Sequence, residues 1–283
     1  MNKQESKTAI RRILVAVDAS SHSLAALEAA AELAARMEAE LLGLFVEDIN
    51  LLQLAELPFV QGVSYPSTVG QQLDKSKMER ALKVKAEQAR RALATIAEQL
   101  HVRWSFRTVR GYITSEVLEA ALEADLLTLG KSSRQVARRV ELGSTAREAI
   151  ARAPRPVLLV QHGISIKQPV LVVYDGSEFA KQALAIGADM AQAYGDGLVV
   201  LILAETSDVA QRLENEVTAW LQGRKLQVDY RWLDKLDAQS LIQTIQTERG
   251  GILILSSKSP DLSLETIQEI LEKINCPVLL VRP

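Results

Sequence analysis

The chain contains little cysteine and no long apolar run. Its single cysteine among 283 residues, Cys276, cannot form an internal disulfide, which fits a reducing compartment, and we expect a cytoplasmic protein. Apolar runs such as PVLLV and GILIL are far shorter than the roughly 20 apolar residues that span a bilayer. The first residues, MNKQESKTAIRR, are charged and lack the apolar core of a secretory signal. We therefore expect no contact with a membrane.

A large net charge is also absent, because 33 lysines and arginines nearly balance 35 aspartates and glutamates. The resulting charge of −2 argues against a dedicated nucleic-acid-binding protein. The sequence has no P-loop, no Gly-x-Ser-x-Gly nucleophile elbow and no His-Cys-carboxylate cluster with zinc spacing, so we expect no metal-ligating residues. We interpret His22, His101 and His162 as surface or loop residues, and Cys276 as a small core residue.

One pattern occurs twice along the chain. Residues 11–47 and 168–205 each contain an apolar strand, then Asp, a small residue and Ser, then an alanine-rich helix and a second apolar strand. Asp18 and Asp175 occupy the same point of the pattern, and both copies end alike, in APRPVLLVQ and NCPVLLVRP. A chain of 283 residues is long enough for two modest domains.

We predict that residues 1–163 and 164–283 each form an α/β domain in which five strands alternate with helices. The strands are short, nearly continuous apolar runs, which is typical of strands buried on both faces of a parallel sheet. This alternation predicts a doubly wound open sheet with right-handed crossovers. We take its strand order to be 3-2-1-4-5. The ten predicted strands are 12–18, 40–47, 103–109, 125–130, 156–160, 169–174, 197–203, 226–232, 251–256 and 277–282.

The two copies differ in the segment that follows their second strand. The first copy carries an extra stretch, residues 48–80, before a long predicted helix at 74–99, whereas the second has only a short predicted helix, TSDVAQRLENEV. A long insertion at the carboxyl end of a strand is often functional, and this one could cover the crevice beside it. Packing alone accounts for it equally well.

Two residues suited to ligand binding follow strands that the predicted order makes neighbours. Asp18 follows the first strand and Gly130 ends the fourth, so both flank the crevice where the strand order reverses. A carboxylate there can accept hydrogen bonds from ribose hydroxyls or an adenine amino group, and a glycine lets backbone approach a ligand. Aspartate is as common in turns and helix caps, so Asp18 alone leaves both interpretations open.

An arginine-rich loop leads from Gly130 to a predicted helix that begins with Gly143, Ser144 and Thr145. The free N–H groups and the positive dipole end of a helix N-terminus favour an anion such as phosphate. A helix start without a ligand, and a solvated basic face, are the plainer interpretations. The positive charges of this loop come from Lys131, Arg134, Arg138 and Arg139.

Together these residues resemble the ATP-binding motif of the universal stress protein family, Gly-x2-Gly-x9-Gly-Ser/Thr, with an Asp at the end of the first strand. Gly130, Gly143 and Ser144 match the motif at its spacing, and Ser133 stands at the second glycine, where it adds a Cβ and a hydroxyl. The resemblance covers essentially the whole chain. It implies a tandem member of the family, with two domains of the adenine nucleotide alpha hydrolase-like fold paired about a pseudo-twofold axis.

The resemblance also implies which residues would hold ATP, with or without Mg²⁺. Apolar side chains, the Asp18 carboxylate and strand-end backbone would surround the adenosine, and small hydroxyl residues would surround the phosphates. The adenosine residues would be Ala16, Val17, Asp18, Val46, Leu129 and Gly130. The phosphate residues would be Ser133, Gly143, Ser144 and Thr145.

The second copy departs from this motif. Ser256 stands where the first copy has Gly130, the loop that follows is much shorter, and no Gly-Ser pair ends it. We predict that this copy does not bind ATP in the family's manner and serves as a structural partner. The resemblance implies that the copies pair through their fifth strands, and an apolar sheet edge that needs covering gives this pairing a physical motive.

Three functions remain open from the sequence. The first is a nucleotide-binding regulatory or stress-response protein that is not an efficient enzyme and presents a changed surface to an unknown protein partner. The second is a slow ATPase, although the loop offers no evident general base. The third is a tandem chain that binds no nucleotide and interacts with a protein or another small ligand. In each case the chain could stay monomeric or form a homodimer.

Overall fold

A computed structural model describes most of the chain from residue 10 to residue 282. It leaves out residues 1–9, 57–60, 65–66, 73–74, 132–133, 137–138, 165, 167–168, 196, 235–237, 249–250, 259–261 and 283. For 61–64, 67–72, 134–136 and 139–141 it describes the backbone alone. Among the described residues, every helix is too short or too polar to cross a membrane.

The first half of the chain forms five parallel strands, close to the ranges that the sequence predicted. They are β1 (Arg12–Ala16), β2 (Glu40–Asp48), β5 (Trp104–Gly111), β6 (Leu126–Gly130) and β9 (Val157–Val160). Their spatial order, β5-β2-β1-β6-β9, is 3-2-1-4-5 when the five are numbered along the chain. The order therefore reverses between β1 and β6, as predicted, because β1 pairs with both β2 and β6.

The second half repeats this arrangement. Its strands are β10 (Val170–Tyr174), β11 (Gly197–Leu203), β12 (Gln227–Leu233), β13 (Ile252–Ser256) and β14 (Val278–Val281). Their order, β12-β11-β10-β13-β14, is again 3-2-1-4-5. The predicted repeat and fold class are therefore confirmed in both halves.

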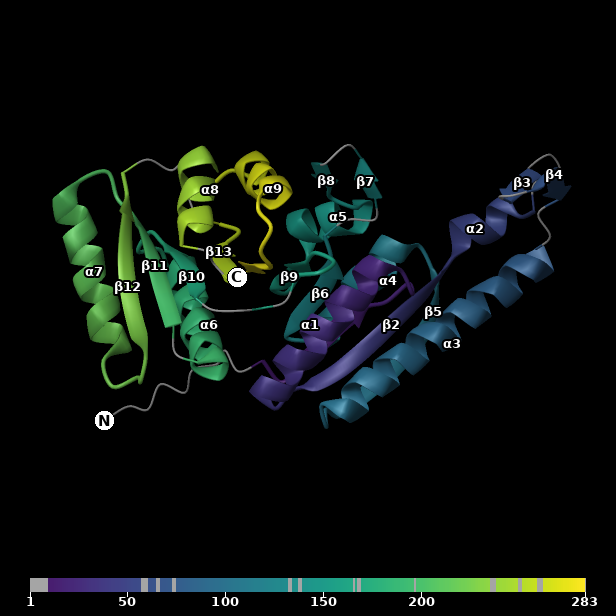
Figure 1. Ribbon diagram of the computed structural model, residues 1–283, viewed down its shortest axis with the longest axis horizontal. Coiled ribbons are helices and arrows are strands. Elements are labelled where there is room, and N and C mark those ends of the chain that lie inside the picture. The colour runs from purple at the N-terminus through teal and green to yellow at the C-terminus, as the bar shows by residue number, and fades with distance from the viewer. Residues whose placement is uncertain are drawn as a thin grey trace.

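The two five-stranded sheets join into one sheet through their fifth strands. β9 pairs with β14 in antiparallel fashion, with Leu158 opposite Leu279, so each strand covers the other's apolar edge. Figure 1 shows the halves side by side with β9 and β13 near the middle of the molecule. The prediction that the fifth strands pair is confirmed. The predicted domain boundary after residue 163 falls between β9 and β10 and stays a prediction.

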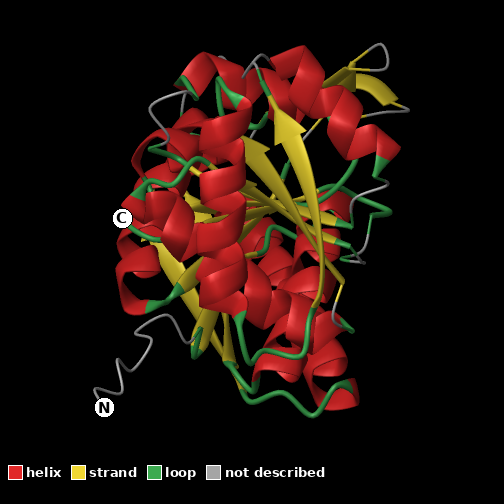
Figure 2. Ribbon diagram, turned by 90° about the vertical axis from the view of Figure 1, so that its left-hand side faces the viewer, coloured by secondary structure: helices red, strands yellow, loops and turns green. Residues whose placement is uncertain are grey.

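Helices cover both faces of this twisted sheet (Figure 2). Adjacent residues of one strand serve opposite faces: Ile13 packs in the apolar cluster of one face and Leu14 in that of the other. The helices of the first face are α1 (Ser21–Met37), α3 (Lys75–Gln99), α6 (Glu178–Tyr194) and α7 (Ser207–Leu221). Those of the second are α4 (Ile113–Ala120), which a 3-10 turn η1 (Ala121–Glu123) extends, α5 (Ser144–Arg152), α8 (Ala238–Thr247) and α9 (Leu264–Lys273).

Two small hairpins and a short helix lie outside the predicted pattern. α2 (Ile49–Leu54) packs on α3, and β3 (Gln61–Ser64) pairs with β4 (Ser67–Gln72) at the far end of the first half (Figure 1). β7 (Arg134–Val136) pairs with β8 (Arg139–Glu141) inside the arginine-rich loop. These additions follow β2 or β6 along the chain, and they leave the order of the main sheet unchanged.

Candidate functional site

A cavity of about 260 Å³ opens where β1 and β6 end, at the reversal of strand order in the first half. Its volume lies just below the range of small-molecule sites, about 300 to 1,000 Å³. The residues predicted for the ATP site that line it are Ala16, Val17, Asp18, Val46, Leu129, Gly130, Gly143, Ser144 and Thr145. The remaining predicted residue, Ser133, lies outside the described residues. The fold therefore brings together residues that are up to 129 positions apart, Ala16 and Thr145.

Asp18 is held in a tight turn that starts α1. Its Oδ1 accepts a hydrogen bond from the Ser20 N–H at 2.9 Å, and its own N–H donates to Ser23 Oγ at 3.2 Å. Burial alone would raise the pKa of the Asp18 carboxyl, but hydrogen bonds from Ser20 and Ser23 outweigh it and lower the pKa below its ordinary value. The group is therefore an anion at neutral pH, and its remaining lone pairs are acceptors only.

The turn also contains a strained residue. Ala19, between Asp18 and Ser20, has φ of +63°, in the left-handed region that costs a non-glycine residue roughly 1–2 kcal/mol. The conformation persists because Asp18 holds one side of the turn and Ser20 caps α1 on the other, with Ser20 Oγ accepting from the Ser23 N–H at 3.2 Å. Strain of this kind concentrates at ligand sites.

Gly130 is required by packing within the protein. A Cβ placed on it would lie 2.9 Å from the backbone oxygen of His22, closer than such atoms approach in proteins. The sequence explained this glycine by the approach of a ligand, but the space beside its Cα is filled by the first turn of α1. The absence of a side chain thus lets α1 pack tightly on the end of β6, which forms one wall of the cavity.

The N-terminus of α5 forms another wall and carries no cap. Gly143 is its N-cap residue, in an extended conformation, and no described side chain accepts a hydrogen bond from the N–H groups of its first turn. By contrast, Ser20 caps α1, Ser177 caps α6 and Ser263 caps α9. The first residues of α5 therefore present N–H groups, the positive end of a helix dipole and two hydroxyls to the cavity.

The comparisons with known proteins agree with this geometry. The model of the universal stress protein family matches residues 9–161, more than half of the chain. The chain belongs to the universal stress protein family. A universal stress protein of Methanocaldococcus jannaschii is 28% identical to it over 153 residues, which are 53% of this chain and 82% of that protein.

Solved structures show that the fold of this universal stress protein extends over both halves. The crystal structure of a universal stress protein from Archaeoglobus fulgidus superposes with a TM-score of 0.74 at 17% identity, and the match covers 96% of this chain and 98% of that one. A functionally unknown protein of Pseudomonas aeruginosa gives a TM-score of 0.59 at 16% identity, over 98% and 94% of the two chains. A tandem architecture of two such domains therefore accounts for the whole chain.

The second half of this universal stress protein builds the same turn but fills the space around it differently. Asp175 accepts from the Ser177 N–H at 2.8 Å, as Asp18 does from Ser20. Leu213 of α7 packs over Gly176, within 2.7 Å of where a Cβ would stand. Ser256 replaces Gly130, and its Oγ accepts from the Lys258 N–H at 3.1 Å. The aspartate is thus explained by the turn in both halves, and the glycine and the uncapped helix distinguish the first.

Seven further residues line the cavity but were not predicted from the sequence: Ser20, His22, Ser23, Leu44, Ile113, Val117 and Ala146. Two signals could have found some of them. Leu44 lies two residues before Val46 on β2 and so shares its face. Ile113 and Val117 are four residues apart and share one face of α4. No pattern in the sequence indicated that α4 would reach the cavity.

Several expectations about the loop after Gly130 need correction or lie outside the described residues. Lys131 was expected to supply positive charge in the loop, but its side chain is fully buried and points toward the second half. The structure describes only the backbone of Arg134 and Arg139, and Arg138 lies outside the described residues. His22, interpreted as a surface or loop residue, is half-buried in the first turn of α1 and lines the cavity.

The extra segment and possible metal ligands contribute nothing to this site among the described residues. Of residues 48–80, those whose side chains are described do not line the cavity. In the same part of the chain, no group of three or more His, Cys, Asp or Glu side chains is placed to hold a metal ion. Cys276 is buried, as expected of a small core residue, and burial raises the pKa of its thiol.

Proposed function

We propose that the first half binds an adenine nucleotide, ATP above all, and that the protein acts in regulation or stress response through this binding. The observation that carries the proposal is the pairing, in one cavity, of an ionised carboxylate with the uncapped N-terminus of α5. A nucleotide needs both, because its ribose and base donate hydrogen bonds and its phosphates accept them. The motif that resembles the family's ATP-binding loop supports the same assignment.

The lining suggests how the nucleotide lies. Asp18 would accept hydrogen bonds from ribose hydroxyls or from the adenine amino group, and Leu44 and Val46 would pack on the base. The phosphates would meet the first turn of α5, where Ser144 and Thr145 add hydroxyl donors. By its place in the motif, Ser133 would join these residues around the phosphates. A Mg²⁺ ion would arrive with the phosphates, which supply its oxygen ligands.

We further propose that binding, and not efficient hydrolysis, is the function. The described titratable side chains that line the cavity are Asp18 and His22. Asp18 is ionised and already accepts the Ser20 N–H, and its low pKa makes it a weak base. Ordering of the loop between Gly130 and Gly143 by the phosphates would alter the surface presented to a protein partner. The second half, with Ser256 at the strand end, would serve as the structural partner.

Calorimetric titration with ATP and Mg²⁺ tests the proposal, with Asp18→Asn and Asp175→Asn as a matched pair. Asparagine keeps an acceptor for the turn and removes the charge, so both variants should fold. Asp18→Asn should weaken binding about tenfold or more, since hydrogen bonds to charged groups contribute about 1.5–3 kcal/mol. Asp175→Asn should bind as the wild type does, because Asp175 builds the same turn away from the cavity.

Two results would overturn the proposal. Absence of heat and of a thermal shift at millimolar nucleotide would leave a chain that binds no nucleotide and serves as an interaction protein. Phosphate release at a steady rate, abolished by Asp18→Asn, would identify a slow ATPase. A purified protein whose absorbance at 260 nm exceeds that of its aromatic residues would show a nucleotide carried through purification.

A further inference from the structure

Lys131 connects the site of the first half to the second half of the chain. Its side chain is fully buried, and Nζ donates hydrogen bonds to the backbone oxygens of Ile274 at 2.9 Å and Cys276 at 3.3 Å. Both acceptors lie between α9 and β14, in the second half. Because a buried ammonium group is costly without partners, these two carbonyls fix where the side chain goes.

The backbone of Lys131 connects two residues that line the cavity, Gly130 and Gly143. Its N–H donates to the Val160 oxygen at 2.7 Å, and its carbonyl accepts the Gly143 N–H at 3.2 Å. The residue therefore stands between Gly130, which ends β6, and Gly143, which begins α5. Both of these neighbours line the cavity. Any shift of Lys131 moves the strand end and the helix start that would face the nucleotide.

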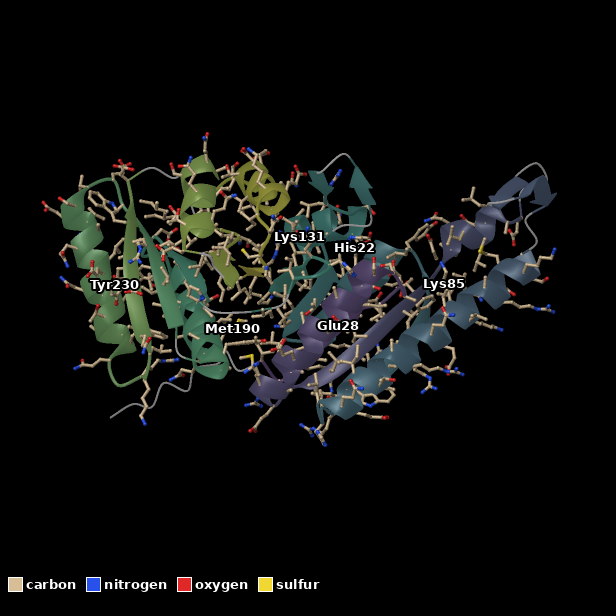
Figure 3. All side chains as sticks on the ribbon, in the orientation of Figure 1. His22, Glu28, Lys85, Lys131, Met190 and Tyr230 are labelled. Atoms are coloured by element: carbon tan, nitrogen blue, oxygen red, sulfur yellow. The ribbon has the colours of Figure 1, made fainter. Side chains whose placement is uncertain are left out.

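Among the described residues, the matching position of the second half does not return this contact. Ser257 occupies the position of Lys131 in the second half, directly after Ser256. A different cation of the second half contacts the first: Arg282, after β14, donates to the backbone oxygens of Ala149 and Ile150 near the end of α5. The second half therefore anchors α5 near its start, through Lys131, and at its end. Figure 3 shows Lys131 above α1, close to the label of His22 and near the junction of the two halves.

We propose that Lys131 is a positioning residue of the nucleotide site, held in place by the second half, so that nucleotide binding and the docking of the second half stabilise each other. This rests on the proposed nucleotide function. In physical terms, a nucleotide that fixes Gly130 and Gly143 also fixes the peptide of Lys131, and with it the hydrogen bonds to Ile274 and Cys276. By reciprocity, a second half that holds Lys131 in place raises the affinity for the nucleotide.

The test compares Lys131→Met with Arg36→Met in the full chain. Both cations donate from the first half to a carbonyl of the second, since Arg36 donates to the Ala193 oxygen at 3.0 Å. Arg36 lies at the far end of α1, away from the cavity. Lys131→Met should weaken ATP binding by at least about fivefold, the lower end of couplings between sites. Arg36→Met should leave ATP affinity unchanged, and circular dichroism should show both variants folded.

Amide hydrogen exchange gives a readout that does not require a nucleotide. In the free protein, the Gly143 and Arg147 amides, bonded to the oxygens of Lys131 and Gly143, should exchange faster in Lys131→Met than in the wild type or Arg36→Met. With ATP, exchange at β14 should slow in the wild type and not in Lys131→Met. If the two variants match each other in exchange at Gly143, Lys131 has a structural role only and the inference is wrong. If the wild type binds no ATP but Gly143 still responds to Lys131→Met, the proposed function fails while the positioning role stands.

Discussion

At the scale of single residues, the turn before each first helix is built with two different residues. Ala19 has φ of +63° and its counterpart Gly176 has φ of +82°, and each follows an aspartate that accepts the N–H two residues on. The two halves therefore need the same left-handed backbone. The first half makes it with a residue that disfavours it, next to the cavity, and the second with a residue that allows it.

Exchanging the two residues should separate strain from packing. Ala19→Gly relieves roughly 1–2 kcal/mol of backbone strain but adds freedom to the unfolded chain, so the free energy of unfolding should stay equal or rise by up to about 1 kcal/mol. Gly176→Ala should lower it by more than about 1 kcal/mol, because its Cβ would also stand 2.7 Å from Leu213. Urea denaturation measures both free energies of unfolding. A clearly lower value for Ala19→Gly would show that Ala19 is not strained.

Gly130 allows a similar comparison with a glycine in open space. Gly130→Ser installs the residue of the second half and forces the His22 backbone away, which should cost about 1–3 kcal/mol and weaken ATP binding. Gly163→Ala is the control, since no atom lies within 4 Å of its Cβ position and only its φ of +78° opposes the change. Thermal unfolding and calorimetry should show loss of binding in Gly130→Ser alone. Unchanged affinity there would mean that α1 does not form the wall of the site.

Burial of Lys131 should make the free energy of unfolding depend on pH in the alkaline range. Desolvation lowers the pKa of its amino group to about 8, from 10.5 in an unfolded chain. Below pH 8 both states bind the proton and this group adds no pH dependence. Between these values the unfolded chain binds more protons, so the free energy of unfolding should rise with pH, by up to about 3 kcal/mol.

Urea midpoints of wild type and Lys131→Met, measured from pH 7 to 10, check this dependence. The Cys276 thiol also titrates at high pH, and its pKa is raised by burial and partly lowered by the charge of Lys131. Both proteins therefore carry Cys276→Ala, so that the difference between their curves reports Lys131. The difference should grow above pH 8. Parallel curves would show that Lys131 titrates as an exposed lysine does.

At the scale of elements, the two last helices of the halves are started differently. α9 is capped by Ser263, whose Oγ accepts the Thr266 N–H at 3.1 Å, and α5 begins with Gly143 and no capping side chain. An uncapped helix end inside a cavity is a ready anion site, whereas a capped one has its N–H groups partly engaged. The elements match in place and differ in the property that binding requires.

A cap on α5 should therefore trade binding for stability. Gly143→Asp supplies a carboxylate that accepts first-turn N–H groups and favours the helix dipole, so the free protein should gain a few tenths of a kcal/mol. The same charge repels phosphate, and ATP affinity should fall about tenfold or more. Ser263→Ala, the control on α9, should lose about 1 kcal/mol of stability and keep its affinity. Calorimetry and thermal unfolding distinguish the two, and full ATP affinity in Gly143→Asp would contradict an anion site at α5.

How far the sequence predicts these elements depends on burial. The ten strands of the sheet were predicted as short, nearly continuous apolar runs. Eight of them are buried along most of their length, whereas the edge strands β5 and β12 are largely half-buried or exposed. The hairpins β3–β4 and β7–β8 lack such runs and were not predicted. Lys131 was misplaced for a related reason: a charged residue beside glycine and serine resembles a solvent loop, and only the tertiary contact with Ile274 buries it.

At the scale of the whole molecule, the two halves share one sheet and both of its apolar faces. The clusters on either side of the sheet each contain residues of both halves: Ile13 and Val172 on one face, Leu14 and Leu253 on the other. β9 and β14 are buried along their full length and pair with each other at the junction. The halves should therefore unfold together, because separating them would expose apolar residues of both.

A chain that ends at residue 163 should therefore form a dimer. Removal of the second half exposes β9, a flat apolar strand with unpaired N–H and C=O groups, and such edges recruit another strand. The sequence of β9, VLLV, is identical to that of β14, so a second copy of β9 offers the same antiparallel partner. Sedimentation of residues 1–163 should give a dimer, whereas the full chain has this edge covered from within. A monomeric fragment with a native circular dichroism spectrum would contradict this prediction, because it would show that the first half folds without a partner strand on β9.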